Sequence, residues 1–243
     1  MRSDSPGKPL LIVLAGNTFP QISSTAGDFD DWIAAGLDNP PSQLRIDARE
    51  ASTLPPPATL AGVVISGSHA MVTDRQPWSE RLAAWLRTCV EARTPVLGIC
   101  YGHQLLAHAL GGRVGYRPGG LEIGTHDVTL TPAAAEDALF GTTPPAFPAQ
   151  LVHAQAVLEL PPGATLLASS AEEPCQAMRV GSRAWGVQFH PEFSAEAMRG
   201  YIRCKAEALI AQRRDPSALL TAVRETPEAA NLLRRFAAEV ARA

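Results

Sequence analysis

The sequence contains no hydrophobic run long enough to cross a membrane. Residues 10–15 form its first apolar stretch, whereas a spanning helix needs about 20 apolar residues. No small-residue cleavage pattern follows this stretch, as it would in a secretory leader. We therefore expect a buried strand at residues 10–15 and a cytoplasmic protein with no membrane partner.

A strong charge of either sign is also missing. Lys and Arg number 21 against 24 Asp and Glu, which gives a formal net charge of −3 at pH 7. Binding to a phosphate backbone requires a basic stripe or patch. The charge pattern provides no such stripe, so we expect no nucleic-acid partner.

No two cysteines lie close enough in sequence to form a C-x-x-C pair. The four cysteines are Cys89, Cys100, Cys175 and Cys204. Paired spacing is typical of zinc and redox sites, and a dense array of cysteines is typical of secreted disulfide frameworks. We therefore expect reduced thiols, in agreement with a cytoplasmic location, and no metal site.

Buried strands and amphipathic helices alternate in the first half of the chain. The apolar pattern predicts strands at residues 9–17, 43–48, 62–68 and 95–100, and helices at residues 28–37, 78–89 and 103–110. Parallel neighbours in a sheet need a crossover connection between them. This order therefore predicts an α/β fold with a mostly parallel sheet and helices on both faces.

The second half of the chain has a different pattern. Short strands separated by proline and glycine turns are predicted at residues 125–132, 150–157, 164–170, 176–182 and 184–190. With little helix between them, they are expected to extend the sheet with antiparallel strands. Residues 194–243 then predict two amphipathic helices, divided near Asp215 and Pro216. A chain of 243 residues fits one α/β domain, so we predict a single domain, residues 1–243, with residues 194–243 as a C-terminal helical extension.

Cys100 lies between two glycines at a predicted junction of strand and helix. The order strand, Gly98-x-Cys100-x-Gly102, helix is typical of a nucleophile elbow, in which glycines permit a sharp turn and close packing. The start of the helix directs backbone N–H groups at the thiol, and the N–H of Tyr101 becomes a candidate oxyanion-hole donor. An isolated cysteine is more often a packing residue, but this context favours a nucleophile.

His190 and Glu192 are candidate partners for this thiol. A cysteine nucleophile needs a base, and the base needs a group that holds its tautomer. His190 ends a predicted strand, and Glu192 lies on the same side if the backbone stays extended through Pro191. A zinc site from Cys100, His103 and other histidines is the weaker alternative, because no paired-ligand spacing occurs.

Three motifs together carry a family resemblance: GICYGHQ at residues 98–104, GVQFHPEF at 186–193 and VVISGSHAMVTD at 63–74. Over about residues 10–200 the sequence resembles the class I, or triad, glutamine amidotransferases, whose domains are flavodoxin-like. The resemblance implies that Cys100 is the nucleophile, His190 the general acid/base and Glu192 its orienting carboxylate. Within the family, the motifs are most similar to the glutaminase part of GMP synthase.

The resemblance also implies roles for residues around the triad. Gly67 and Ser68 match a loop that provides the second oxyanion-hole N–H, and Gln104 matches a glutamine that helps to seat the substrate. Glu122 takes the place of an acidic residue that is a candidate partner of the substrate α-amino group, and His153 matches a substrate-site histidine. For Gln104, Glu122 and His153, a purely structural hydrogen-bonding role is an equal alternative.

The sequence departs from the family motifs at three positions. Ser68 replaces the second glycine of an S-G-G-P loop, Leu121 replaces an arginine before the acidic residue, and Gln155 replaces a common aspartate. The loss of charge at Gln155 mildly favours substrates other than free glutamine.

The resemblance implies cysteine-dependent hydrolysis of the glutamine side-chain amide through a γ-glutamyl thioester, with no cofactor. The protein would work alone or with a separate synthase that uses the ammonia. Hydrolysis of another γ-glutamyl amide or peptide is the first alternative, and a non-catalytic binding or regulatory role is the second. The intact set of Cys100, His190 and Glu192 argues against the second alternative, since binding alone does not need all three.

Overall fold

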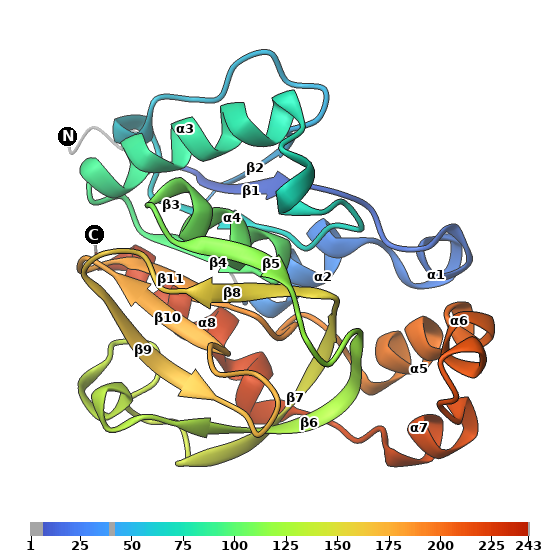
Figure 1. The fold of residues 1–243 in the computed structure, drawn as a ribbon. Coiled ribbons are helices and arrows are strands. Elements are labelled where there is room, and N and C mark those ends of the chain that lie inside the picture. Colours follow the sequence, from blue (N-terminus) through green and yellow to red (C-terminus); the bar gives the residue numbers. More distant parts are fainter. Residues whose placement is uncertain (1–6, 39–41, 243) are drawn as a thin grey trace.

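A computed structural model describes residues 7–38 and 42–242 (Figure 1). The strands are β1 (Leu10–Leu14), β2 (Gln43–Asp47), β3 (Gly62–Ile65), β4 (Val96–Ile99), β5 (Arg113–Tyr116), β6 (Glu122–Leu130), β7 (Ala146–His153), β8 (Gln155–Glu159), β9 (Ala164–Ser169), β10 (Ala177–Val180) and β11 (Ala184–Val187). The α-helices are α1 (Pro20–Ala26), α2 (Phe29–Gly36), α3 (Pro77–Glu91), α4 (Tyr101–Ala109), α5 (Ala195–Cys204), α6 (Ala206–Ala211), α7 (Pro216–Ala222) and α8 (Pro227–Ala241).

The main sheet has the predicted mixture of strand directions. Its order is β2-β1-β3-β4-β11-β10-β9-β6-β7. The strands from β2 to β11 in this order are parallel, and β10, β9, β6 and β7 extend the sheet with antiparallel pairs. The prediction of a parallel core with an antiparallel extension is confirmed.

The parallel strands are buried on both faces, which explains why their sequences are continuously apolar. In β1, Leu10 and Ile12 pack in one core with α2 and α8. Leu11 and Val13 point the other way, into a core with α3 and α4. An apolar core therefore packs against each face of the sheet, and the two cores together fix the positions of the strand ends.

The structure corrects four details of the sequence prediction. The strand expected at residues 150–157 is divided at Ala154 into β7 and β8, which belong to different sheets. β8 pairs instead with β5, and neither β5 nor α1 was predicted. The β5 segment is short and only partly buried, so it has no clear apolar pattern.

The C-terminal segment contains four helices where two were predicted. The first predicted helix is interrupted at Lys205, between α5 and α6, and the second is interrupted before Pro227, between α7 and α8. Proline has no N–H to donate and is tolerated in the first turn, so Pro227 starts a new helix. Figure 1 shows α5, α6 and α7 grouped on the side toward which β1 points. Ala243, the predicted end of the last helix, lies outside the described residues.

In the described part of the chain, no helix is both long enough and apolar enough to cross a membrane.

Candidate active site

Cys100 occupies a strained turn between β4 and α4. Its backbone has φ 49° and ψ −96°, a conformation that non-glycine residues rarely adopt and that is often found at functional sites. The side chain is 6% exposed, and its thiol lies 3.8 Å from the carbonyl oxygen of Val152. The predicted elbow is therefore present as a geometric feature.

The two glycines of the elbow allow a very close approach of backbone segments. A Cβ atom added at Gly98 would lie 2.4 Å from the carbonyl oxygen of Gly102. A Cβ atom added at Gly102 would lie 2.6 Å from the carbonyl oxygen of Ile65, at the end of β3. Any side chain at either position would separate α4 from the strands beneath it, so both glycines are required by packing.

His190 and Glu192 form a buried pair at the end of β11. Nδ1 of His190 lies 2.8 Å from a carboxylate oxygen of Glu192, and the two residues are 2% and 9% exposed. Because the carboxylate accepts, Nδ1 carries the hydrogen and Nε2 has a free lone pair in the neutral ring. Nε2 is buried without a hydrogen-bond partner among the described residues, which leaves it available to exchange a proton with a reacting group.

Aromatic rings fix the plane of the His190 imidazole. Its ring stacks on Phe193, with ring centroids 4.1 Å apart, and the Phe29 ring lies nearly parallel to it, with centroids 6.2 Å apart. Gly67 leaves room for the ring, since a Cβ atom there would lie 2.9 Å from His190 Cε1. These contacts leave the imidazole one orientation.

The charge balance around His190 favours its protonated form. Burial by itself lowers the pKa of the imidazole, but the negative charges of Glu192 and of the Cys100 thiolate outweigh burial and raise the pKa of His190 to about 10.

A cavity of about 100 Å³ opens above the thiol. The predicted residues that line it are Ser68, Cys100, Tyr101, Gln104, His153 and His190. Glu192 lies behind the imidazole, and Glu122 is not part of the wall either. The motifs far apart in the sequence are therefore brought to one pocket.

Ser68 and Tyr101, the two predicted oxyanion donors, both line the cavity. Tyr101 begins α4, where the first backbone N–H groups have no carbonyl partner within the helix. Ser68 does not have a positive φ, so the loop needs no glycine at this position. Its hydroxyl accepts a hydrogen bond from the N–H of Ala70 at 3.0 Å, which orders the loop.

Gln104 and Gln155 connect the wall of the pocket to neighbouring segments. The side-chain amide of Gln104 donates to the carbonyl of Gln155 at 2.7 Å and to the side chain of Gln188 at 3.0 Å. The Gln155 amide donates to the hydroxyl of Thr73 at 2.5 Å. Both side chains are thus held by hydrogen bonds to other protein groups, and both line the cavity.

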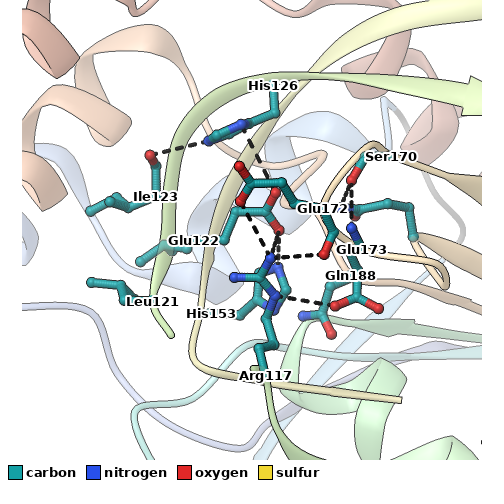
Figure 2. A network of polar contacts seen from close by, with 12 residues as sticks. Arg117, Leu121, Glu122, Ile123, His126, His153, Ser170, Glu172, Glu173 and Gln188 are labelled. Carbon is teal, nitrogen blue, oxygen red and sulfur yellow. Dashed lines mark hydrogen bonds and ion pairs between the residues drawn. The ribbon is translucent and has the colours of Figure 1, made fainter. Parts of the chain in front are cut away.

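His153 joins the pocket to a buried ion cluster (Figure 2). Its Nδ1 lies 2.8 Å from the carbonyl oxygen of Gln155, and its Nε2 lies 2.7 Å from a carboxylate oxygen of Glu122. Burial raises the pKa of Glu122, but the hydrogen bond from His153 and the charge of Arg117 reverse this effect and lower the pKa. Both ring nitrogens of His153 therefore face oxygen atoms that can accept a hydrogen bond.

Arg117 completes this cluster. Its guanidinium lies 3.6 Å from Glu122 and 3.2 Å from Glu173, and all three side chains are almost fully buried. Leu121 stands where the family motif has an arginine, and the structure brings Arg117, five positions before Glu122, to the Glu122 carboxylate. Glu122 is thereby held behind His153 instead of facing the cavity.

Several wall residues were not predicted from the motifs. Phe29 comes from α2, and Tyr201 and Lys205 come from α5 and its junction with α6. Tyr201 is fixed by a hydrogen bond from the hydroxyl of Thr18 at 2.9 Å. None of these residues stands in a recognisable motif, since tertiary packing alone brings them to the cavity.

The zinc alternative receives no support from the positions of the side chains. His103 points toward Cys175, with 3.9 Å between Nε2 and Sγ, and burial lowers its pKa to about 3. Across residues 7–38 and 42–242, no group of three or more His, Cys, Asp or Glu side chains could hold a metal ion.

Comparison with known proteins identifies the family. The sequence model of "Glutamine amidotransferase class-I" matches residues 41–205. The chain belongs to the class I glutamine amidotransferase family. This match includes Cys100, His190 and Glu192, and it confirms the resemblance inferred from the motifs.

Individual relatives of this amidotransferase-family chain differ in their named activities. "Gamma-glutamyl peptidase 5" of Arabidopsis thaliana is 36% identical over 139 residues, which cover 56% of this chain and 55% of the peptidase. "GMP synthase [glutamine-hydrolyzing]" of Thermomicrobium roseum is 38% identical over 137 residues, which cover 54% of this chain and 23% of the synthase. The match thus spans about half of the first relative and about a quarter of the second.

Solved structures support the fold over nearly the whole chain. A glutamine amidotransferase from Methylobacillus flagellatus has a TM-score of 0.75 at 26% identity, covering 97% of this chain and 94% of its own. A glutamine amidotransferase from Thermotoga maritima has a TM-score of 0.76 at 23% identity, covering 97% and 99%. The helices after Glu192 therefore fall within the region of structural similarity.

Proposed function

We propose that the protein hydrolyses a γ-glutamyl amide bond through a thioester on Cys100, with glutamine as the simplest substrate. One observation carries this proposal. A strained, glycine-flanked thiol shares a cavity with an imidazole whose Nδ1 is held by Glu192 and whose Nε2 is buried without a partner. Membership of the amidotransferase family supports the same chemistry.

The first half of the reaction forms the thioester. The Cys100 thiolate attacks the amide carbon, and the negative charge moves to the carbonyl oxygen, where the N–H groups of Ser68 and Tyr101 would stabilise it. Each such donor contributes about 3 kcal/mol to transition-state stabilisation. When the C–N bond breaks, the imidazolium of His190 gives its proton to the leaving amine.

The second half regenerates the enzyme. Neutral His190 takes a proton from water as the water oxygen attacks the thioester carbon, and the C–S bond breaks to return the thiolate. Glu192 stays ionised throughout and stabilises the imidazolium. The products are glutamate and the amine, or ammonia when the substrate is glutamine.

One observation favours a second candidate function, hydrolysis of γ-glutamyl peptides. One relative is named a γ-glutamyl peptidase and is 36% identical. If glutamine is the substrate instead, we propose that the ammonia is used by a separate synthase.

Glutamate release from glutamine and from a panel of γ-glutamyl amides and peptides tests both candidates. Cys100→Ala is the inactive variant, and Cys204→Ala is its matched control because Cys204 is exposed and outside the cavity. We expect release to disappear in Cys100→Ala and to persist in Cys204→Ala. Absence of release from every compound by the wild-type protein would refute the proposal and favour a non-catalytic role.

A further inference from the structure

Lys205 places a positive charge at the edge of the active-site cavity. It is one of only two lysines in the chain and lies at the junction between α5 and α6. The residue is half-buried and lines the cavity together with His69, which is exposed. The nucleophile and its imidazole are fully buried, so Lys205 and His69 mark the mouth of the cavity.

Lys205 has no carboxylate partner among residues 7–38 and 42–242. No ion pair within the described residues involves Lys205, and no Asp or Glu is among the described residues that line the cavity. Burial lowers the pKa of Lys205. Binding of an anionic group to a half-buried cation that has no counter-ion is favourable, because the ligand supplies the missing negative charge.

The ammonium group of Lys205 makes a cation–π contact with an aromatic ring. Its Nζ lies 5.5 Å from the centroid of the Phe19 ring. The Phe19 ring in turn packs against His69 and Tyr201, with centroids 4.5 and 5.1 Å away. This cation–π contact keeps the ammonium at the mouth of the cavity without using any of its three N–H donors for a carboxylate.

The size of the cavity limits how much of a substrate it can hold. Its volume is about 100 Å³, and a γ-glutamyl group bound at the thiol leaves little of this volume free. We therefore expect a leaving group larger than ammonia to extend toward the mouth, where His69 and Lys205 lie. The aromatic surface there contacts the body of such a group, and the ammonium is positioned for an acidic substituent.

We propose that Lys205 is a specificity-determining residue that binds a carboxylate on the leaving group, and that the preferred substrates are γ-glutamyl amino acids. The inference rests on the proposed function and narrows its substrate class. The covalent steps are unchanged, because the leaving amino acid takes its proton from His190 and Lys205 forms only an ion pair. Glutamine lacks this interaction, since its leaving group is ammonia.

Three substrates with the same γ-glutamyl group separate the contributions to recognition. γ-Glutamylglycine has a carboxylate on the leaving group, γ-glutamyl methylamide has a neutral leaving group, and glutamine releases ammonia. The variants are Lys205→Gln, Lys205→Arg and, as a matched loss of charge, Lys8→Gln, because Lys8 is exposed and remote from the cavity.

We expect Lys205→Gln to lower kcat/KM for γ-glutamylglycine by about 10- to 100-fold, since a hydrogen bond to a charged group contributes about 1.5–3 kcal/mol. The other two substrates should change by less than about twofold. Lys205→Arg should restore much of the lost activity, and Lys8→Gln should have no effect. An equal loss on all three substrates would show that Lys205 binds the carboxylate of the γ-glutamyl group, and no loss would show that the subsite does not exist. Either result overturns the proposal.

A binding measurement separates this proposal from the proposed hydrolysis. In the Cys100→Ala background, calorimetry should show tighter binding of γ-glutamylglycine than of the methylamide, and Lys205→Gln should remove the difference. Selective binding without turnover by the wild-type protein would support the subsite and refute the proposed function. Failure to bind either compound, or equal binding of both, would refute the subsite.

Discussion

Replacement of Gly98 by alanine tests whether the packing of the elbow positions the thiol. The added Cβ would lie 2.4 Å from the carbonyl oxygen of Gly102 and 2.8 Å from the N–H nitrogen of His103, whereas ordinary contact begins at 3.4 Å. The shortest contact is therefore 1.0 Å too close. β4 is paired on both sides, with β3 and β11, so α4 has to move away.

This displacement should affect both stability and activity. Overpacking of this kind costs about 1–3 kcal/mol of unfolding free energy, and a shift of about 1 Å at a reacting group lowers the rate roughly 100-fold. Urea unfolding and γ-glutamyl amide hydrolysis measure the two effects. Gly119→Ala is the control, because a Cβ there meets only the end of a side chain at 3.9 Å. Wild-type stability and activity in Gly98→Ala would refute the packing argument.

Two further substitutions test the electrostatics of the site. Glu192→Gln removes a charge that raises the pKa of His190 to about 10, so the alkaline limb of the kcat profile should move to lower pH. The same variant should lower kcat on the order of 10³-fold with less effect on KM, and an unchanged pH profile would contradict the assigned role. Arg117→Met should lower the unfolding free energy by about 3–5 kcal/mol. Burial already raises the pKa of Glu173. When the pKa of a carboxyl is higher in the folded than in the unfolded protein, the unfolding free energy falls as the pH rises above the unfolded pKa. The loss of unfolding free energy in Arg117→Met should therefore be larger at pH 8 than at pH 5, as measured by urea unfolding. Arg113→Met removes an exposed ion pair and should change stability by less than about 1 kcal/mol.

The parallel core of the fold could be predicted because its signals are local. Continuous apolar strands such as residues 62–68 and the helical spacing of residues 78–89 are read directly from the sequence. The division at Ala154 could not be predicted, since the residues on both sides of it favour strand and only tertiary pairing assigns them to different sheets. The interruption at Lys205 was missed for a similar reason, because the apolar spacing continues through it.

The pairing of His190 with Glu192 could be predicted because the two residues are close in sequence. An extended backbone through Pro191 places them on the same side, and their hydrogen bond is present at 2.8 Å. The position of Glu122 depended on a distant partner, Arg117, whose approach depends on how the chain folds between β5 and β6. The family resemblance could therefore suggest a role for Glu122, but not that it lies behind His153.

Detection of the acyl-enzyme is the most direct test of the account. Wild-type protein mixed with a γ-glutamyl amide and quenched in acid within one turnover would be digested and examined by mass spectrometry. We predict that the peptide with Cys100 gains the mass of one glutamyl group, and that the Cys100→Ala protein gains none. Release of glutamate with no adduct on Cys100, or release that persists in Cys100→Ala, would contradict the assignment of Cys100 as the nucleophile.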